Sequence, residues 1–171
     1  MMRILATALI IFTNFILQST LFTHIEFFGI RPNTTLIIVV SIAILRTDID
    51  GAITGFFAGL LQDIVFGRAI GLNALLYMCI GALCGKPFKK FYRENYFLPI
   101  ILVAVSTVFY EFSIFVVSFL FRGRLDMLFY IQRIILPSLA YNAFLAFPVY
   151  RIIYSINGAL EKRESMGRRF Y

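Results

Sequence analysis

The sequence predicts an all-α integral membrane protein with six transmembrane helices and both termini on the cytoplasmic side. Three observations support this class. The 171-residue chain is 60% hydrophobic, with a mean hydropathy of +0.86. Only 15% of its residues are charged, whereas a soluble domain carries about a quarter. Its apolar runs approach the length of about 20 residues that a helix needs to cross the hydrocarbon core.

Six candidate spans follow one another along the chain. The first, 4–22, begins in "MMRILATALIIF" and lacks a signal-peptide cleavage motif, so we expect an uncleaved helix. The others are expected at 33–45, 51–66, 70–85, 97–121 and 127–154. Because the second and third are short, five spans with one re-entrant segment is the alternative.

The basic residues indicate the orientation of these spans. With the N-terminus inside, the inner segments contain most of them, namely Arg3, Arg46, Lys86, Lys89, Lys90, Arg93, Arg151, Lys162, Arg163, Arg168 and Arg169. The outer segments contain Arg31, Arg68, Arg122 and Arg124. Basic residues concentrate in cytoplasmic loops of membrane proteins. The net charge of +7 is therefore explained without a nucleic acid partner.

The chain divides into a transmembrane domain, 1–156, and a basic tail, 157–171. We expect the tail to lie on the anionic cytoplasmic leaflet, and docking of a protein is the alternative. His24 has no metal-binding neighbours in the sequence, and Cys79 and Cys84 point to different sides of one helix. No nucleotide-binding loop, HExxH motif or Ser/His pairing is present. We therefore expect no metal, no cofactor and no catalytic residue.

A stripe of small residues marks the third span. Gly51, Gly55 and Gly59 are spaced by four, and Asp63 and Gly67 continue the spacing. Residues four apart share a helix face, and small side chains let helix backbones approach closely in lipid. The stripe therefore predicts a packed face with Asp63 at its end, pointing into protein.

Two further charges fall within predicted spans. Glu111 lies in the fifth and Arg133 in the sixth, and at 1.5 Å per residue both lie about 21 Å above the inner end. Asp63 lies about 18 Å above it. Each charge would cost roughly 2.5–3.5 kcal/mol in mid-membrane if left alone. We therefore predict that the three form one intramembrane polar cluster.

Other polar residues could extend this cluster, namely Asn14, Gln18, Asn73 and Asn142. Pro137 cannot donate to the carbonyl of residue 133, so a bend is expected beside Arg133. Three roles are open for the cluster. It could fix the register of the helices, form a path for a ligand or protons, or contact a transmembrane helix of a partner.

The stretch around Asp63 resembles the signature of the MreD family of rod shape-determining proteins. The residues that carry the resemblance are Gly55…Gly59-Leu60-Leu61-x-Asp63-x-x-x-Gly67-x-x-x-Gly71-Leu72-x-Ala74-Leu75. Length, spans and basic inner loops also match. The resemblance implies a non-enzymatic scaffold of cell-wall elongation in the bacterial inner membrane. It also implies MreC as the partner and indirect links to MreB, RodA and a class B penicillin-binding protein.

The resemblance further implies a fold similar to the six-helix substrate-binding component of energy-coupling-factor transporters. Such a component, binding a vitamin-type small molecule, is the alternative function. Those components dock through small residues spaced by four on the first helix. Here Ala6 is followed by Ile10, and bulky residues dominate the span, so the scaffold is the preferred interpretation.

Overall fold

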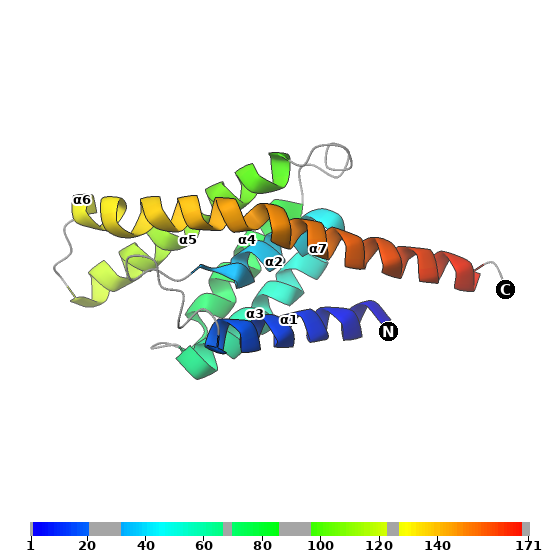
Figure 1. Ribbon diagram of the computed structural model, residues 1–171. Helices are drawn as coiled ribbons and strands as arrows, with labels where there is room; N and C mark the ends of the chain where they lie inside the picture. Colours follow the sequence, from blue (N-terminus) through cyan, green and yellow to red (C-terminus); the bar gives the residue numbers. More distant parts are fainter. Residues whose placement is uncertain (1, 21–31, 67–69, 86–96, 123–126, 169–171) are drawn as a thin grey trace.

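The computed structural model describes residues 2–20, 32–66, 70–85, 97–122 and 127–168, and every regular element within them is helical (Figure 1). The elements are α1 (Met2–Thr20), α2 (Thr34–Leu45), α3 (Asp48–Phe66), α4 (Leu72–Gly85), α5 (Phe97–Arg122), α6 (Met127–Tyr130), the π-helical turn η1 (Ile131–Ile135) and α7 (Leu136–Arg168). The last three form one rod. The predicted all-α class is confirmed, and the described residues contain one helical rod for each of the six expected spans.

Within the described ranges, four rods are long and apolar enough to cross a membrane: Arg3–Thr20, Asp48–Phe66, Phe97–Val117 and Met127–Lys162. The last rod is longer than expected, because α7 continues beyond residue 154 to Arg168. The start of α1 and the end of α7 lie at the same end of the bundle (Figure 1). Large apolar side chains such as Leu5, Phe57 and Val105 are exposed on the outside, where lipid would cover them.

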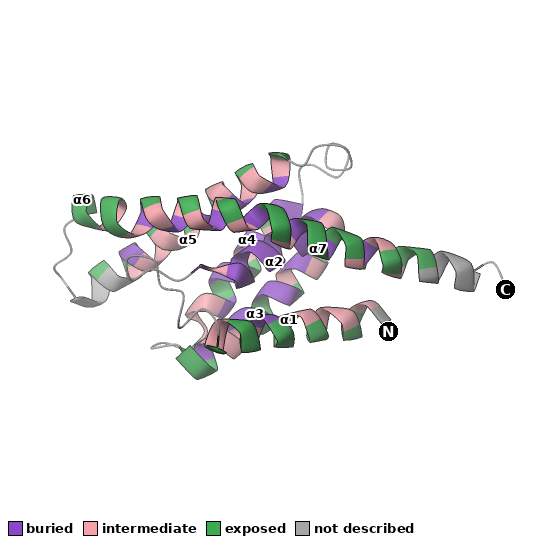
Figure 2. Ribbon diagram, viewed as in Figure 1, coloured by how far each residue is buried: buried purple, intermediate pink, exposed green. Residues whose placement is uncertain are grey.

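The short helix α2 occupies the centre of the bundle (Figure 2). Every residue from Thr34 to Ile44 is buried, and α2 contacts α1, α3, α4, α5 and α7. Its 12 residues span only about 18 Å at 1.5 Å per residue, which is less than the hydrocarbon thickness. Because other helices enclose it, α2 does not need to match that thickness itself. A helix that is apolar on all sides is expected in such a buried position.

Helices α3 and α4 pack backbone against backbone through glycines. A Cβ built on Gly59 would lie 2.5 Å from the Cα of Ala74, and one on Gly55 would meet the backbone of Tyr77. Gly51 lies against Ala43 and against the carbonyl oxygen of Gly81. Lipid offers no hydrophobic force between helices, so this close approach supplies the van der Waals contact that joins them.

The four-residue spacing also predicts helix packing for Gly67 and Gly71. Gly71 does not pack against a helix: a Cβ built there would meet no atom within 4 Å, and its φ of +101° places it in a turn before α4. Glycine adopts this backbone conformation without steric cost, which explains the residue type. Gly67 lies outside the described residues, as does His24.

The rod that contains α6 and α7 includes an irregular turn. The Leu136 N–H donates to the Ile131 carbonyl, five residues back, which defines the π-helical turn η1. Pro137 follows directly and has no N–H to offer the Arg133 carbonyl. The predicted irregularity beside Arg133 therefore takes the form of a π-helical turn.

Candidate functional site

Asp63 caps the first turn of α4. Its carboxylate is 1% exposed and accepts backbone N–H groups from Gly71 at 2.9 Å, Asn73 at 3.3 Å and Ala74 at 3.1 Å. The first N–H groups of a helix have no partner within the helix, and the helix dipole favours a negative charge there. A side chain from α3 thus performs the role that a capping residue usually performs within its own helix.

The three charged side chains that were predicted to form one cluster have separate partners in the structure. No ion pair joins Asp63, Glu111 and Arg133, all of which lie in described helices. Glu111 accepts a long bond of 3.5 Å from the Tyr130 hydroxyl. Arg133 is exposed, and its guanidinium lies 5.6 Å from the centre of the Phe129 ring. The predicted depth of a residue along its helix does not determine the direction in which its side chain points. A long basic side chain near a helix end, such as that of Arg133, can extend toward the membrane interface.

A different set of polar side chains meets at the outer end of α2. We call it the outer network, and it comprises Asn14, Gln18, Asn33, Thr34, Thr35, Asn73, Tyr77, Thr107, Tyr110 and Asn142. These residues come from α1, the start of α2, α4, α5 and α7. Of the predicted secondary contacts, the structure places Asn14, Gln18, Asn73 and Asn142 in this network.

The first part of the outer network is a closed ring of hydrogen bonds between α1 and α2. Asn14 Nδ2 donates to Thr35 Oγ1 at 3.0 Å, and Thr35 donates to Gln18 Oε1 at 3.1 Å. Gln18 Nε2 donates to Thr34 Oγ1 at 3.0 Å, and Thr34 donates to Asn14 Oδ1 at 2.6 Å. Each amide and each hydroxyl both donates and accepts once. The ring gives these polar groups partners in an apolar environment, where an unpaired group would be costly.

The second part of the outer network is centred on Asn33, which caps α2 by accepting the Leu36 N–H at 3.1 Å. The Tyr77 hydroxyl donates to the same Asn33 oxygen at 3.0 Å. The Asn33 N–H donates to Asn142 Oδ1 at 2.9 Å, and Asn142 Nδ2 donates to Thr107 at 3.2 Å. One capping residue thereby connects α2 with α4 and α7, and through Asn142 with α5.

Two aromatic rings connect this part of the network to the cap of α4. Tyr110 donates to Asn73 Oδ1 at 2.7 Å, and the Asn73 N–H donates to Asp63. The Tyr77 and Tyr110 rings are stacked with their centres 5.2 Å apart. Asp63 is therefore joined to the outer network through Asn73, not through a charged partner.

Sequence reasoning missed Asn33, Thr34, Thr35, Tyr77, Thr107 and Tyr110. A signal existed for the first three, because "NTT" stands at the start of the most apolar helix, and Asn and Thr are typical residues at a helix start. The two tyrosines carried no such signal, since tyrosine and phenylalanine are abundant throughout the chain.

A cavity of about 280 Å³ adjoins the outer network. Gln18, Asn33, Gln62, Tyr110 and Glu111 contribute its polar wall. The Gln62 Oε1 atom is buried and has no hydrogen-bond partner among the described residues. Chemically, the cavity offers acceptors and one carboxyl group. In the part of the chain that the structure describes, no group of three or more His, Cys, Asp or Glu side chains could hold a metal ion.

Comparison with known proteins identifies a family. A family model described as "rod shape-determining protein MreD" matches residues 1–156. No curated protein and no solved structure matches the chain significantly. The matched range contains the glycine stripe, Asp63 and the whole outer network. With a match over most of its length, the chain belongs to the MreD family of rod shape-determining proteins.

Proposed function

We propose that the chain is a non-enzymatic scaffold in the bacterial inner membrane that binds the transmembrane helix of MreC. Through MreC it would position RodA and a class B penicillin-binding protein, with an indirect connection to MreB. Family membership implies a role in rod shape determination. The partners, the inner membrane and the absence of catalysis are parts of the proposal.

The observation that carries the proposal is the use of polar side chains within the bundle. The outer network joins five helices, and its members bond mainly to one another. Other hydroxyls donate to carbonyls of their own helices, as Ser41 does to Ile37 at 2.6 Å and Ser113 does to Phe109 at 2.7 Å. An activated nucleophile instead needs a base within hydrogen-bonding reach. The arrangement favours a rigid frame over a reaction centre.

A groove between α5 and α7 is the surface that we assign to MreC. Its volume is about 460 Å³, and its lining residues are Ala104, Val105, Val108, Phe109, Phe112 and Leu139. All are apolar, so the groove provides no polar ligand site. In lipid, helices associate by shape and close packing, and a groove with a small residue such as Ala104 allows close approach. A single apolar helix such as that of MreC fits these properties.

Affinity purification of the tagged protein from native membranes, followed by mass spectrometry, tests this function. We expect recovery of MreC together with RodA and its synthase partner. An untagged strain and an unrelated tagged polytopic protein serve as controls. Recovery of neither MreC nor the synthase pair would contradict the scaffold.

The outer cavity favours a second candidate, a substrate-binding component of a transporter. Its polar wall and the unpaired Gln62 oxygen would suit a small ligand that carries hydrogen-bond donors. The same purification separates the two functions. A transporter would recover a membrane coupling protein with paired ATPases in place of MreC.

A further inference from the structure

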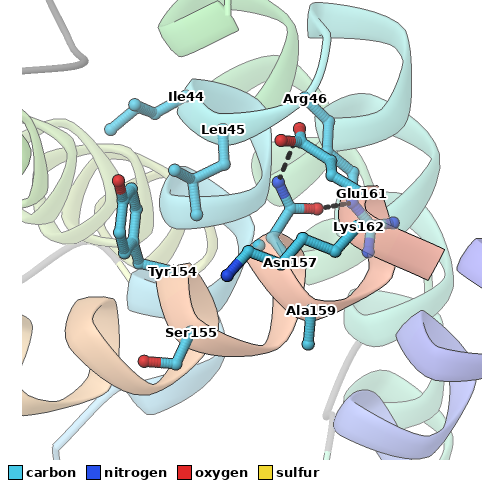
Figure 3. Close-up of a pocket in the computed structure, with 10 residues that line it drawn as sticks. Ile44, Leu45, Arg46, Tyr154, Ser155, Asn157, Ala159, Glu161 and Lys162 are labelled. Carbon is cyan, nitrogen blue, oxygen red and sulfur yellow. Dashed lines mark hydrogen bonds between the residues drawn. The ribbon is translucent and has the colours of Figure 1, made fainter. Parts of the chain in front are cut away.

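A second, larger cavity lies at the opposite end of α2. We call it the inner pocket; it has a volume of about 700 Å³ and lies between residues 44–46 and the part of α7 between residues 154 and 162 (Figure 3). This is the end of the bundle where the positive-inside pattern predicts the cytoplasm. Its volume falls in the range of small-molecule sites, about 300–1,000 Å³.

The walls of the inner pocket are amphipathic. Ile44, Leu45 and Tyr154 lie on one side of the view in Figure 3, and Arg46 and Glu161 lie on the other. Ser155 adds a hydroxyl group. Such a lining matches a molecule that has a polar head and a hydrocarbon chain. Phospholipids with this shape are present at the depth where the transmembrane helices end.

Arg46 is held in a fixed position at the edge of the pocket. Its Nε donates to Asn157 Oδ1 at 2.9 Å, and Nη1 donates to Thr7 Oγ1 at 2.7 Å and to the Arg3 carbonyl at 3.5 Å. Asn157 in turn donates to Glu161 at 3.4 Å. The guanidinium is therefore oriented by α1 and α7 before any ligand arrives. Preorganised positive charge of this kind favours binding of an anion.

The balance of charge in the pocket is also positive. Among the described residues that line it, Arg46 and Lys162 are cations and Glu161 is the single anion, which leaves a formal charge of +1. The side chain of Lys162 extends across the pocket toward Tyr154 (Figure 3). A basic group at the membrane surface attracts anionic lipid by about 1 kcal/mol, or about fivefold in affinity.

We propose that the inner pocket binds the phosphate headgroup of an anionic phospholipid from the cytoplasmic leaflet. Arg46 and Lys162 supply the opposing charge, and Ser155 supplies a hydroxyl donor. Ile44 and Leu45 contact the start of an acyl chain. Lipid binding at the inner pocket does not require MreC. A negative result for this site would therefore leave the proposed scaffold function untouched, and the reverse also holds.

Native mass spectrometry of the full chain, purified in detergent, tests this site. Phosphatidylglycerol, phosphatidylcholine and soluble glycerol 3-phosphate are added in separate titrations. We expect phosphatidylglycerol to bind more tightly than phosphatidylcholine. We also expect Lys162→Gln to weaken phosphatidylglycerol binding about fivefold. Removing the opposing negative charge in Glu161→Gln should strengthen it.

Arg151→Gln is the matched control, because Arg151 is an exposed cation of the same helix and does not line the pocket. Its affinity for phosphatidylglycerol should equal that of the wild type. Three results would overturn the site. They are equal binding of the two lipids, equal losses in Lys162→Gln and Arg151→Gln, or binding of glycerol 3-phosphate as tight as that of the lipid. Unchanged thermal melting of each variant shows that the fold is intact.

Discussion

Asp63 stabilises the bundle as a cap on a neighbouring helix. Its carboxylate accepts three hydrogen bonds from backbone N–H groups at the start of α4. Without Asp63, these N–H groups would have no partner within the helix. Because the donors are backbone groups, no partner side chain is needed to keep the carboxylate in place. The residue thus fixes where α4 begins relative to α3, and with it the position of Asn73.

Asp63→Asn should lower the stability of the purified protein. An amide has one acceptor oxygen, so at least one N–H of α4 loses its bond, which costs about 1–3 kcal/mol. Thermal unfolding in detergent measures the effect. Glu111→Gln is the matched control, because Glu111 is also a carboxylate within a span, and its hydrogen bond from the Tyr130 hydroxyl is long, at 3.5 Å. Equal melting temperatures for Asp63→Asn and the wild type would contradict the capping role.

The central helix α2 is attached at both ends. At the outer end, Asn33, Thr34 and Thr35 bond to the surrounding helices, and at the inner end Arg46 bonds to Thr7 and Asn157. Between the ends, the helix is apolar and enclosed. This explains how a helix of 12 residues can occupy a membrane protein core without spanning the bilayer alone.

The ring of hydrogen bonds between α1 and α2 predicts a measurable coupling. A double-mutant cycle of Asn14→Ala and Thr34→Val should give a coupling energy of about 0.6 kcal/mol, the average for hydrogen bonds inside membranes, and at most about 1.7 kcal/mol. The direct bond of 2.6 Å between these residues is the reason. Asn14→Ala combined with Ser106→Ala is the control, since Ser106 contacts Cys84 instead. Strictly additive effects in the first cycle would rule out the ring.

The contact between α3 and α4 predicts that even a methyl group is too large at its centre. Gly55→Ala should destabilise the protein by about 1–3 kcal/mol, because the new Cβ would meet the Tyr77 backbone. Gly158→Ala in α7 has open space around its Cβ and is the matched control. It should be neutral or slightly stabilising, since alanine favours helix. A Gly55→Ala protein that melts like the wild type would remove Gly55 from the contact.

For the molecule as a whole, the sequence predicted the helices better than their contacts. Apolar runs determine where spans lie, because the membrane selects them by length and composition. The four-residue spacing of the glycines indicated a packed face but could not identify α4 as the neighbour. The partners of Asp63 are backbone N–H groups, which have no signature in the sequence. The direction of Arg133 likewise depends on tertiary structure, so matching depth did not predict contact.

We propose that the whole bundle is a rigid frame that presents the groove between α5 and α7. The outer network joins five helices, and the glycine contact joins α3 to one of them, α4. The α5–α7 groove remains on the lipid-facing side. A test of the scaffold function must therefore compare contact of the partner with this groove and contact of the partner with a more exposed lipid-facing surface.

The most direct measurement is site-specific photo-crosslinking to MreC in living cells. A benzophenone side chain would replace Val108 in the groove or Leu5 on α1. Val108 is 39% exposed and Leu5 is 73% exposed, so random collision favours the α1 position. We predict the reverse, with a strong MreC adduct from position 108 and little from position 5. Equal adducts at both positions, or a stronger adduct from position 5, would contradict the assignment of the groove to MreC.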